Sequence, residues 1–286
     1  MNMQILVQFA LKASIFLSVF AIGLKSRPND TIFLLQRPAK LVRSLLAMDV
    51  IMPVIATAMV WSFDLHEAVE VSLVALAVSP VPPILPKKQI KAQGEPSYAI
   101  GLLVVAAAVA VVFIPVAIEL VGRLLQTPVH MEMWPIARLV LVTVLAPLLA
   151  GILFRELAPA IAAQLSKSVA LVAGAALVVS VVPLLIAAWP GIVALIGNGT
   201  IVAIAVFVLL GLAVGHMLGG PDPHDRAVLA LATATRHPGV ALAIGSANFP
   251  EQKAVLPAIL LYALIGAILT IPYVIWRKRA DYSSAR

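Results

Sequence analysis

Cysteine is absent from this chain of 286 residues. Disulfide bridges, zinc sites built on thiolates and thiol catalysis are therefore excluded, and no redox compartment can be inferred. The motifs of common enzyme sites are missing as well. The chain has no glycine-rich phosphate loop, no His-Glu-x-x-His, no Gly-x-Ser-x-Gly and no pair of carboxylates within one apolar segment. From these absences we expect no enzyme activity, no metal site and no cofactor.

Charged residues are also scarce. They make up 12% of the chain, against about 25% in an ordinary soluble domain. Hydrophobic residues make up 62%, and the mean hydropathy is +1.06. The apolar residues come in continuous blocks of about 20, the length that a helix needs to cross about 30 Å of hydrocarbon. Since the blocks do not alternate as barrel strands do, the sequence predicts an all-α integral membrane protein surrounded by a lipid bilayer.

We predict about nine transmembrane helices, with the whole chain, 1–286, forming a single transmembrane domain. The third and the eighth spans are interrupted by residues that break helices. The predicted ranges are about 4–24, 39–62, 66–86, 98–121, 134–154, 167–188, 192–215, 226–247 and 254–276.

Lys and Arg gather on one side of this predicted topology. The connections after the first, third, fifth and seventh spans, with the C-terminal tail, hold 15 of the 20 basic residues. These are Lys25, Arg27, Arg37, Lys40, Arg43, Lys87, Lys88, Lys91, Arg155, Lys167, Arg226, Arg277, Lys278, Arg279 and Arg286. Since cytoplasmic loops collect basic residues, we expect an outside N-terminus and a cytoplasmic C-terminus in a plasma or bacterial inner membrane. The same distribution explains the net charge of +7 without a nucleic-acid partner.

Two of the predicted spans cannot be continuous helices. The third contains three prolines within four residues, and each proline lacks the backbone N–H that a helix requires. The eighth is interrupted by the sequence His-Pro-Gly. The residues that break the two helices are Pro80, Pro82, Pro83, Pro238 and Gly239.

The two breaks lie five spans apart, which indicates an internal repeat. An odd offset reverses the direction in which a segment crosses the membrane, so we predict inverted repeats over about 4–121 and 134–276. Interrupted helices at matching positions of two repeats are the best sequence pointer to the binding site of a secondary transporter. An isolated proline elsewhere, such as Pro53 or Pro147, need mean no more than a kink. We therefore expect a substrate to bind at the two breaks.

Polar side chains near the breaks are the candidate binding residues. Arg236 is costly to place inside a membrane, and its planar fork of donors suits a carboxylate, so we predict that it contacts an anionic substrate. It could instead take the place of a coupling cation, or only neutralise the C-terminus of a helix beside a water-filled vestibule. His237 could carry a proton during transport. Ser79, Thr233 and Thr235 would add polar contacts.

Asp49 lies in the middle of the second predicted span. A carboxylate at that depth needs a partner or a function, so we predict that it pairs with Arg236 or couples protons. The alternative is a structural ion pair that holds two helices together.

Several short motifs follow one another in a recognisable order. They are Phe20-Ala-Ile-Gly23-Leu, Arg37-Pro38, Ile51-Met52-Pro53, Ser79-Pro80, and Arg226 opening a broken helix that ends in Ala241-Leu-Ala-Ile. Over about residues 10–275 this order resembles the bile acid:sodium symporter family. The resemblance implies a core domain in which the two broken helices cross, a panel domain, and a substrate cavity between them. It also implies secondary transport of organic anions such as bile acids, usually coupled to sodium.

The sequence departs from that family at both breaks. The family typically carries Gly-Gly and Ser-Asn in the first crossing region, where this chain has Ser79-Pro80-Val-Pro82-Pro83. In the second it typically carries a Glu followed by Gln-Asn, which help to bind sodium. Here the matching stretch is Thr233-Ala-Thr235-Arg236-His237-Pro238, which has no carboxylate. This difference weighs against sodium coupling, and it leaves sodium and protons both open as the coupling ion.

We therefore predict a secondary active transporter of a small organic anion, a carboxylate or a bile-acid-like molecule, that works by alternating access. One alternative is a carrier of an inorganic oxyanion or metalloid, although such carriers often use a membrane cysteine. Another is a membrane sensor or scaffold that keeps a transporter fold without transporting, since it would show the same loss of the sodium carboxylate. The sequence does not indicate an oligomeric state.

Overall fold

The computed structural model describes residues 3–127 and 129–284, and in those ranges all regular structure is helical, with no strand. Seven of the helices there are long and apolar enough to cross a membrane. The first helix, α1 (Met3–Gly23), adds a shorter apolar stretch, Phe9–Gly23. The prediction of an all-α, multi-pass membrane protein is confirmed. The count of nine spans and the boundaries of the two repeats stay predictions.

Four long helices correspond to uninterrupted predicted spans. They are α7 (Pro96–Leu124), α10 (Pro159–Ala194), α11 (Thr200–Leu218) and α14 (Val255–Ser284). Both α7 and α10 begin with a proline, which is tolerated there because the first N–H groups of a helix have no partner within it. The helix α10 is longer than the predicted 167–188. The extra turns at its start are an alanine-rich stretch that begins at Pro159 and runs without a break into the apolar part of the helix.

Two further spans each contain a turn of π-helix that ends two residues before a proline. The first runs through α3 (Pro38–Leu45), η1 (Leu46–Ile51) and α4 (Met52–Ser62). The other runs through α8 (Met133–Val140), η2 (Leu141–Leu145) and α9 (Ala146–Leu157). Pro53 and Pro147 are each the second residue of the α-helix that follows. Because proline has no N–H to donate, the regular ladder of bonds is disturbed upstream of it, and wide turns of this kind often mark functional positions.

The two predicted interruptions are present, as expected from their prolines. The chain leaves α5 (Glu67–Val78), crosses a non-helical segment at 79–84 and re-enters a helix as α6 (Leu85–Lys91). It likewise leaves α12 (Pro223–Ala234) and re-enters as α13 (Pro238–Asn248) after three residues. A short helix, α2 (Pro28–Ile32), connects α1 to α3.

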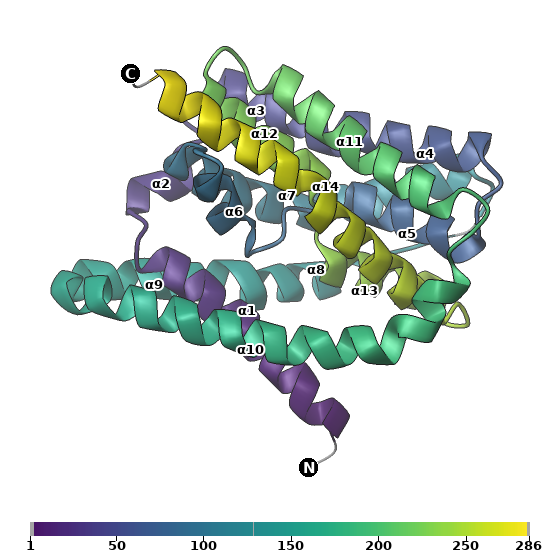
Figure 1. Cartoon of the computed structure of the whole chain (residues 1–286), viewed down its shortest axis with the longest axis horizontal. Helices are drawn as coiled ribbons and strands as arrows, with labels where there is room; N and C mark the ends of the chain where they lie inside the picture. The colour runs from purple at the N-terminus through teal and green to yellow at the C-terminus, as the bar shows by residue number, and fades with distance from the viewer. Residues whose placement is uncertain (1–2, 128, 285–286) are drawn as a thin grey trace.

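The helices form two layers (Figure 1). In one layer α1 packs against both α9 and α10, and in the other the broken helices are surrounded by α3, α4, α7, α11 and α14. The second layer holds most of the buried apolar core, and residues 227–232 of α12 are fully inaccessible to solvent. The backbone of each broken helix therefore ends inside protein and not in lipid, which is the only place at that depth where a helix can be interrupted.

Candidate functional site at the helix breaks

The two helix breaks touch each other. The backbone N–H of His237, in the break of the eighth predicted span, donates a hydrogen bond of 2.9 Å to the carbonyl oxygen of Pro80, in the break of the third. Ser79 and the three prolines of the first break are buried, as are Arg236 and His237 of the second, and Thr235 is partly buried. The residues predicted to form one site are thus brought together, although more than 150 positions separate the two breaks in the sequence.

Arg236 is bound entirely to backbone carbonyl groups. Its side chain is almost inaccessible, with 1% of the residue exposed. Nε donates to the carbonyl oxygen of Leu76 at 3.1 Å, and Nη2 donates to those of Met48, at 2.8 Å, and Ala77. A buried guanidinium needs acceptors for its donors, and carbonyl oxygens supply them here in place of a carboxylate.

These carbonyls are available because of nearby prolines. In a continuous helix the carbonyl of Leu76 would accept the N–H of the residue at position 80, but that residue is a proline. Met48 lies in the π-turn, where Met52 donates to Ala47 instead, and the next donor in line would be Pro53, which has no N–H. The helix breaks therefore expose a set of oxygen acceptors, and the guanidinium of Arg236 occupies it.

The electrostatics of this position favour a cation. The carbonyls of Leu76 and Ala77 end α5, and the C-terminal end of a helix carries a partial negative charge. Asp49 is close enough to interact electrostatically with Arg236, although the two side chains form no hydrogen bond or ion pair in the described part of the chain. The predicted direct pair is thus replaced by a longer-range attraction. Asp49 itself is partly exposed.

Three consecutive residues each keep one polar atom that is buried without a hydrogen-bond partner among the described residues. These atoms are Thr235 Oγ1, Arg236 Nη1 and His237 Nε2. Native proteins pair almost all buried polar atoms, so unpaired ones in a row mark a position where a ligand or water is expected.

His237 has its protonation pattern set by the fold. Its Nδ1 accepts from the backbone N–H groups of Gly239, at 3.1 Å, and Val240, at 3.3 Å, and so caps the N-terminus of α13. An imidazole nitrogen that accepts carries no proton, so in the neutral ring the proton resides on Nε2. The unpaired Nε2 is therefore a donor, as is the unpaired Nη1 of Arg236.

Ser79 and Thr233 have different surroundings from the other predicted binding residues. The Ser79 hydroxyl donates to the carbonyl of Ala75 at 2.6 Å. The Thr233 hydroxyl is placed to donate to the carbonyl of Gly211 at 2.5 Å and that of Leu229 at 2.8 Å. Both hydroxyls are thus used within or between helices, and their roles as substrate contacts stay predictions.

Sequence reasoning did not anticipate Tyr262. This residue of α14 donates its hydroxyl to the carbonyl of Ala234 at 2.9 Å, at the C-terminus of α12. It is 3% exposed. The signal in the sequence was the residue type alone, a tyrosine within an apolar span, since buried tyrosine hydroxyls usually find a hydrogen-bond partner.

A cavity of about 130 Å³ lies along the part of α5 that precedes the first break, and no residue of either break lines it. It is formed by α5, α7 and α13 with the loop that follows α7, and its walls are mostly apolar. Its few polar residues include Asn248 and, from the first turn of α5, Glu67 and Glu70. Its lining includes Ala75, the residue next to Leu76, whose carbonyl binds Arg236.

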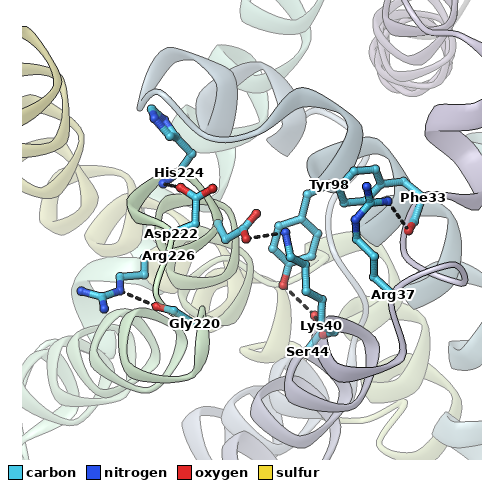
Figure 2. A network of polar contacts seen from close by, with 10 residues as sticks. Phe33, Arg37, Lys40, Ser44, Tyr98, Gly220, Asp222, His224 and Arg226 are labelled. Atoms are coloured by element: carbon cyan, nitrogen blue, oxygen red, sulfur yellow. Dashed lines mark hydrogen bonds and ion pairs between the residues drawn. The ribbon is translucent and has the colours of Figure 1, made fainter. Parts of the chain in front are cut away.

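A second polar network holds the start of α12 (Figure 2). Lys40 of α3 forms an ion pair with Asp225 at 2.5 Å, and the hydroxyls of Ser44 and Tyr98 are 2.7 Å apart beside it. Asp225 is 2% exposed. A partly buried ion pair of this kind fixes one geometry more than it stabilises, so the network orients α12 on α3 and α7.

The part of the chain that the structure describes contains no group of three His, Asp or Glu side chains that could hold a metal ion. Residues 13–195 match the sodium bile acid symporter family. The chain belongs to this family. The matched range runs from α1 to the end of α10 and contains the first break but not Arg236. No curated protein is similar enough to the chain to count as a match.

Membership in the sodium bile acid symporter family confirms the resemblance expected from the order of the motifs. Family members are transporters and not enzymes, and the family implies a sodium-coupled carrier of a solute across a lipid bilayer. The broken helices and the apolar spans are consistent with a membrane carrier.

Proposed function

We propose that this symporter-family chain is a secondary active transporter of a small organic anion and that it does not depend on sodium. The single observation that carries the proposal is the position of Arg236. Its guanidinium occupies the carbonyl oxygens of Met48, Leu76 and Ala77, which form the kind of site that a transported cation would need.

The argument against sodium is one of charge and space. A sodium ion needs several oxygen ligands, and the carbonyls of Leu76, at the first break, and of Met48, in the π-turn, already accept hydrogen bonds from a guanidinium. A second positive charge beside the first would be repelled in a medium of low dielectric constant. Arg236 therefore takes over, as a permanent part of the chain, the role of the ion.

The argument for an anion rests on the unpaired donors. Arg236 Nη1 and His237 Nε2 are buried donors, and Thr235 adds a hydroxyl. Such an arrangement suits a ligand that only accepts hydrogen bonds, and an ionised carboxylate is the commonest one. We propose that Thr235 and His237 contact the substrate and that Arg236 provides the charge.

Alternating access would then move one layer of helices relative to the other. We propose α1, α9 and α10 as the panel and the layer that contains the breaks as the core. We also propose that the N-terminus lies outside and the C-terminus in the cytoplasm, in a plasma or bacterial inner membrane. His237, or Asp49, is the group that would carry a proton if the transport is proton-coupled.

Uptake into proteoliposomes tests the function. The probes are three radiolabelled anions, namely a short monocarboxylate, a dicarboxylate and a bile acid, each measured with a sodium gradient and with choline in its place. We expect saturable uptake of at least one of them, at the same rate in both salts. Strong dependence on sodium would overturn the sodium-independent part of the proposal. Absence of flux for all three would favour the sensor or inorganic-anion alternatives.

The variant R236A tests the replacement of the ion directly. Removal of the guanidinium takes one donor away from each of the carbonyls of Met48, Leu76 and Ala77, with Asp49 still near. We expect sodium, compared with choline, to raise the thermal unfolding temperature of purified R236A and to leave the wild type unchanged. The matched control is R123A, which removes an exposed arginine from α7. If sodium stabilises the wild type as much as R236A, the arginine does not occupy the cation position.

A further inference from the structure

At the end of α14 remote from the cavity, two arginines lie near one histidine, and in the described part of the chain neither arginine forms an ion pair with a carboxylate. Arg277 of α14 is 5% exposed, and its Nε is buried with no hydrogen-bond partner among the described residues. An arginine at a helix end normally extends to water or to a counter-ion. The burial of this one indicates a site that is built to hold its charge in place.

Side chains of α14 and α11 lie near Arg277. Its guanidinium lies over the ring of Trp276, 5.6 Å from the centroid. Tyr273, one turn earlier, shares a contact of 2.9 Å between its hydroxyl and Nδ1 of His216 at the end of α11. The same hydroxyl donates to the backbone carbonyl of Arg226 at 3.3 Å, in the first turn of α12. The aromatic residues thus tie together the ends of α11, α12 and α14.

Arg226 brings the second charge. Its Nε donates to the carbonyl of Gly220 at 2.6 Å, and the rest of its guanidinium points away from the Lys40–Asp225 network (Figure 2). Both arginines interact electrostatically with His216 and with Tyr273, and no carboxylate does so. Neither arginine forms an ion pair in the described part of the chain. The cluster therefore has a net positive charge and free donors.

We propose that Arg277 and Arg226, with His216 at the edge, form a binding site for a phosphate group at this end of the helices. Guanidinium forks match phosphate oxygens, and basic pockets between membrane helices hold the phosphates of anionic lipid headgroups. Trp276, which is half-exposed, is the kind of residue that lies at the level of the headgroups. The bound phosphate would fix the start of α12 whose other end forms the second helix break.

The source of the phosphate is either an anionic lipid or free phosphate in solution, and the experiment separates them. Purified protein is titrated in detergent with phosphatidylglycerol, with phosphatidylcholine or with inorganic phosphate at constant ionic strength, and thermal unfolding is recorded. We expect phosphatidylglycerol to raise the unfolding temperature and phosphatidylcholine to leave it unchanged. Stabilisation by inorganic phosphate at comparable concentration, lost in the variant below, would support the site and identify its ligand as a soluble anion.

The variant R277Q assigns the effect to the site, with R279Q as the matched control because it removes an exposed arginine from the same helix. We expect R277Q to bind the anion at least about fivefold more weakly, the effect of losing one basic contact near a membrane surface. R279Q should bind as the wild type does. If R277Q is unstable, R226Q replaces it with the same expected loss. Equal weakening in R279Q, or no weakening in R277Q and R226Q, would show that no specific site exists and overturn the proposal.

Discussion

The two helix breaks are complementary and not equivalent. The first, between α5 and α6, is rich in proline and presents the backbone carbonyls of Leu76 and Ala77, to which Arg236 donates. The second, between α12 and α13, presents donors, namely the guanidinium of Arg236, the Nε2 of His237 and the backbone N–H that bonds to Pro80. Repeats related by sequence would be expected to carry similar groups. Here the first break supplies hydrogen-bond acceptors with partial negative charge, and the second supplies donors with positive charge. Each break therefore depends on the other for its hydrogen bonds.

The largest effect is expected from R236Q, which removes the donor side of this pair. Three carbonyls would lose a charged donor in a buried position, and unpaired buried groups of this kind cost about 1–3 kcal/mol each. We expect thermal unfolding of the purified protein to shift strongly downward. The exposed variant R123Q should lower the free energy of unfolding by less than about 1 kcal/mol. Equal effects from the two variants would mean that the breaks do not depend on each other.

The next effect concerns how α12 is held beside α11. A Cβ added at Gly215 would lie 2.4 Å from the carbonyl oxygen of Leu229 and 2.6 Å from the Cα of Ala230, so the two helix backbones would have to separate. We expect G215A to destabilise the protein by about 1–3 kcal/mol. The matched control is G174A on α10, where nothing lies within 4 Å of the added atom. That variant should be neutral or slightly stabilising, since alanine favours a helix. Thermal unfolding of the three proteins decides the order.

A smaller effect is expected from H237A, which tests whether the second break also needs its own cap. The Nδ1 of His237 accepts from two N–H groups at the start of α13, and loss of such a cap costs about 1 kcal/mol. H237N should recover much of that loss because asparagine caps helices well, yet it does not restore the donor of Nε2. Measured together, unfolding and anion uptake separate the two roles. Full uptake by H237N would remove the imidazole from the substrate site.

The smallest effect is expected from Y262F. The variant removes one hydrogen bond, of 2.9 Å, to the C-terminal carbonyl of α12 and leaves the packing of the ring unchanged. A single bond of this kind contributes about 0.5–1.5 kcal/mol. An unfolding temperature within error of the wild type would show that water can replace the tyrosine at this helix end, which would make the second break less dependent on its neighbours than the first.

Much of the fold follows from local sequence. Long apolar helices lie within most of the predicted spans because continuous apolar blocks favour helices in lipid, and both interruptions fall at the prolines that cause them. The helix predicted at 192–215 begins later, at Thr200, because 195–199 lie outside helices. The π-turns before Pro53 and Pro147 could not be predicted in the same way. A proline predicts that the helix is disturbed but not which form the disturbance takes. The true start of α10 was missed because its first turns, from Pro159, are less apolar than the span that follows.

For the candidate site, the sequence predicts which residues take part but not which groups they contact. A buried arginine beside a helix break follows from the sequence, but its acceptors lie about 160 positions away and no local pattern indicates them. The position of Thr233 near the break predicts a substrate contact, but no local pattern indicates the contact of its hydroxyl with the carbonyl of Gly211, 22 positions away. The pair of Lys40 with Asp225 was hidden for the same reason, because each residue looks like one of many charges near a helix end.

The covalent attachment of Arg236 has a consequence for the energetics of transport. A sodium ion that accompanies a substrate arrives with it and leaves with it, and its gradient can then drive accumulation. A guanidinium fixed to the chain completes every cycle on the side where it started and delivers no net charge. For a monovalent anion that crosses alone, an inside-negative membrane potential favours exit from the cell by about 2.3 kcal/mol per 100 mV. Without a proton to balance it, a carrier of this design would work as an exporter, or as a valve that lets the anion run down its own gradient.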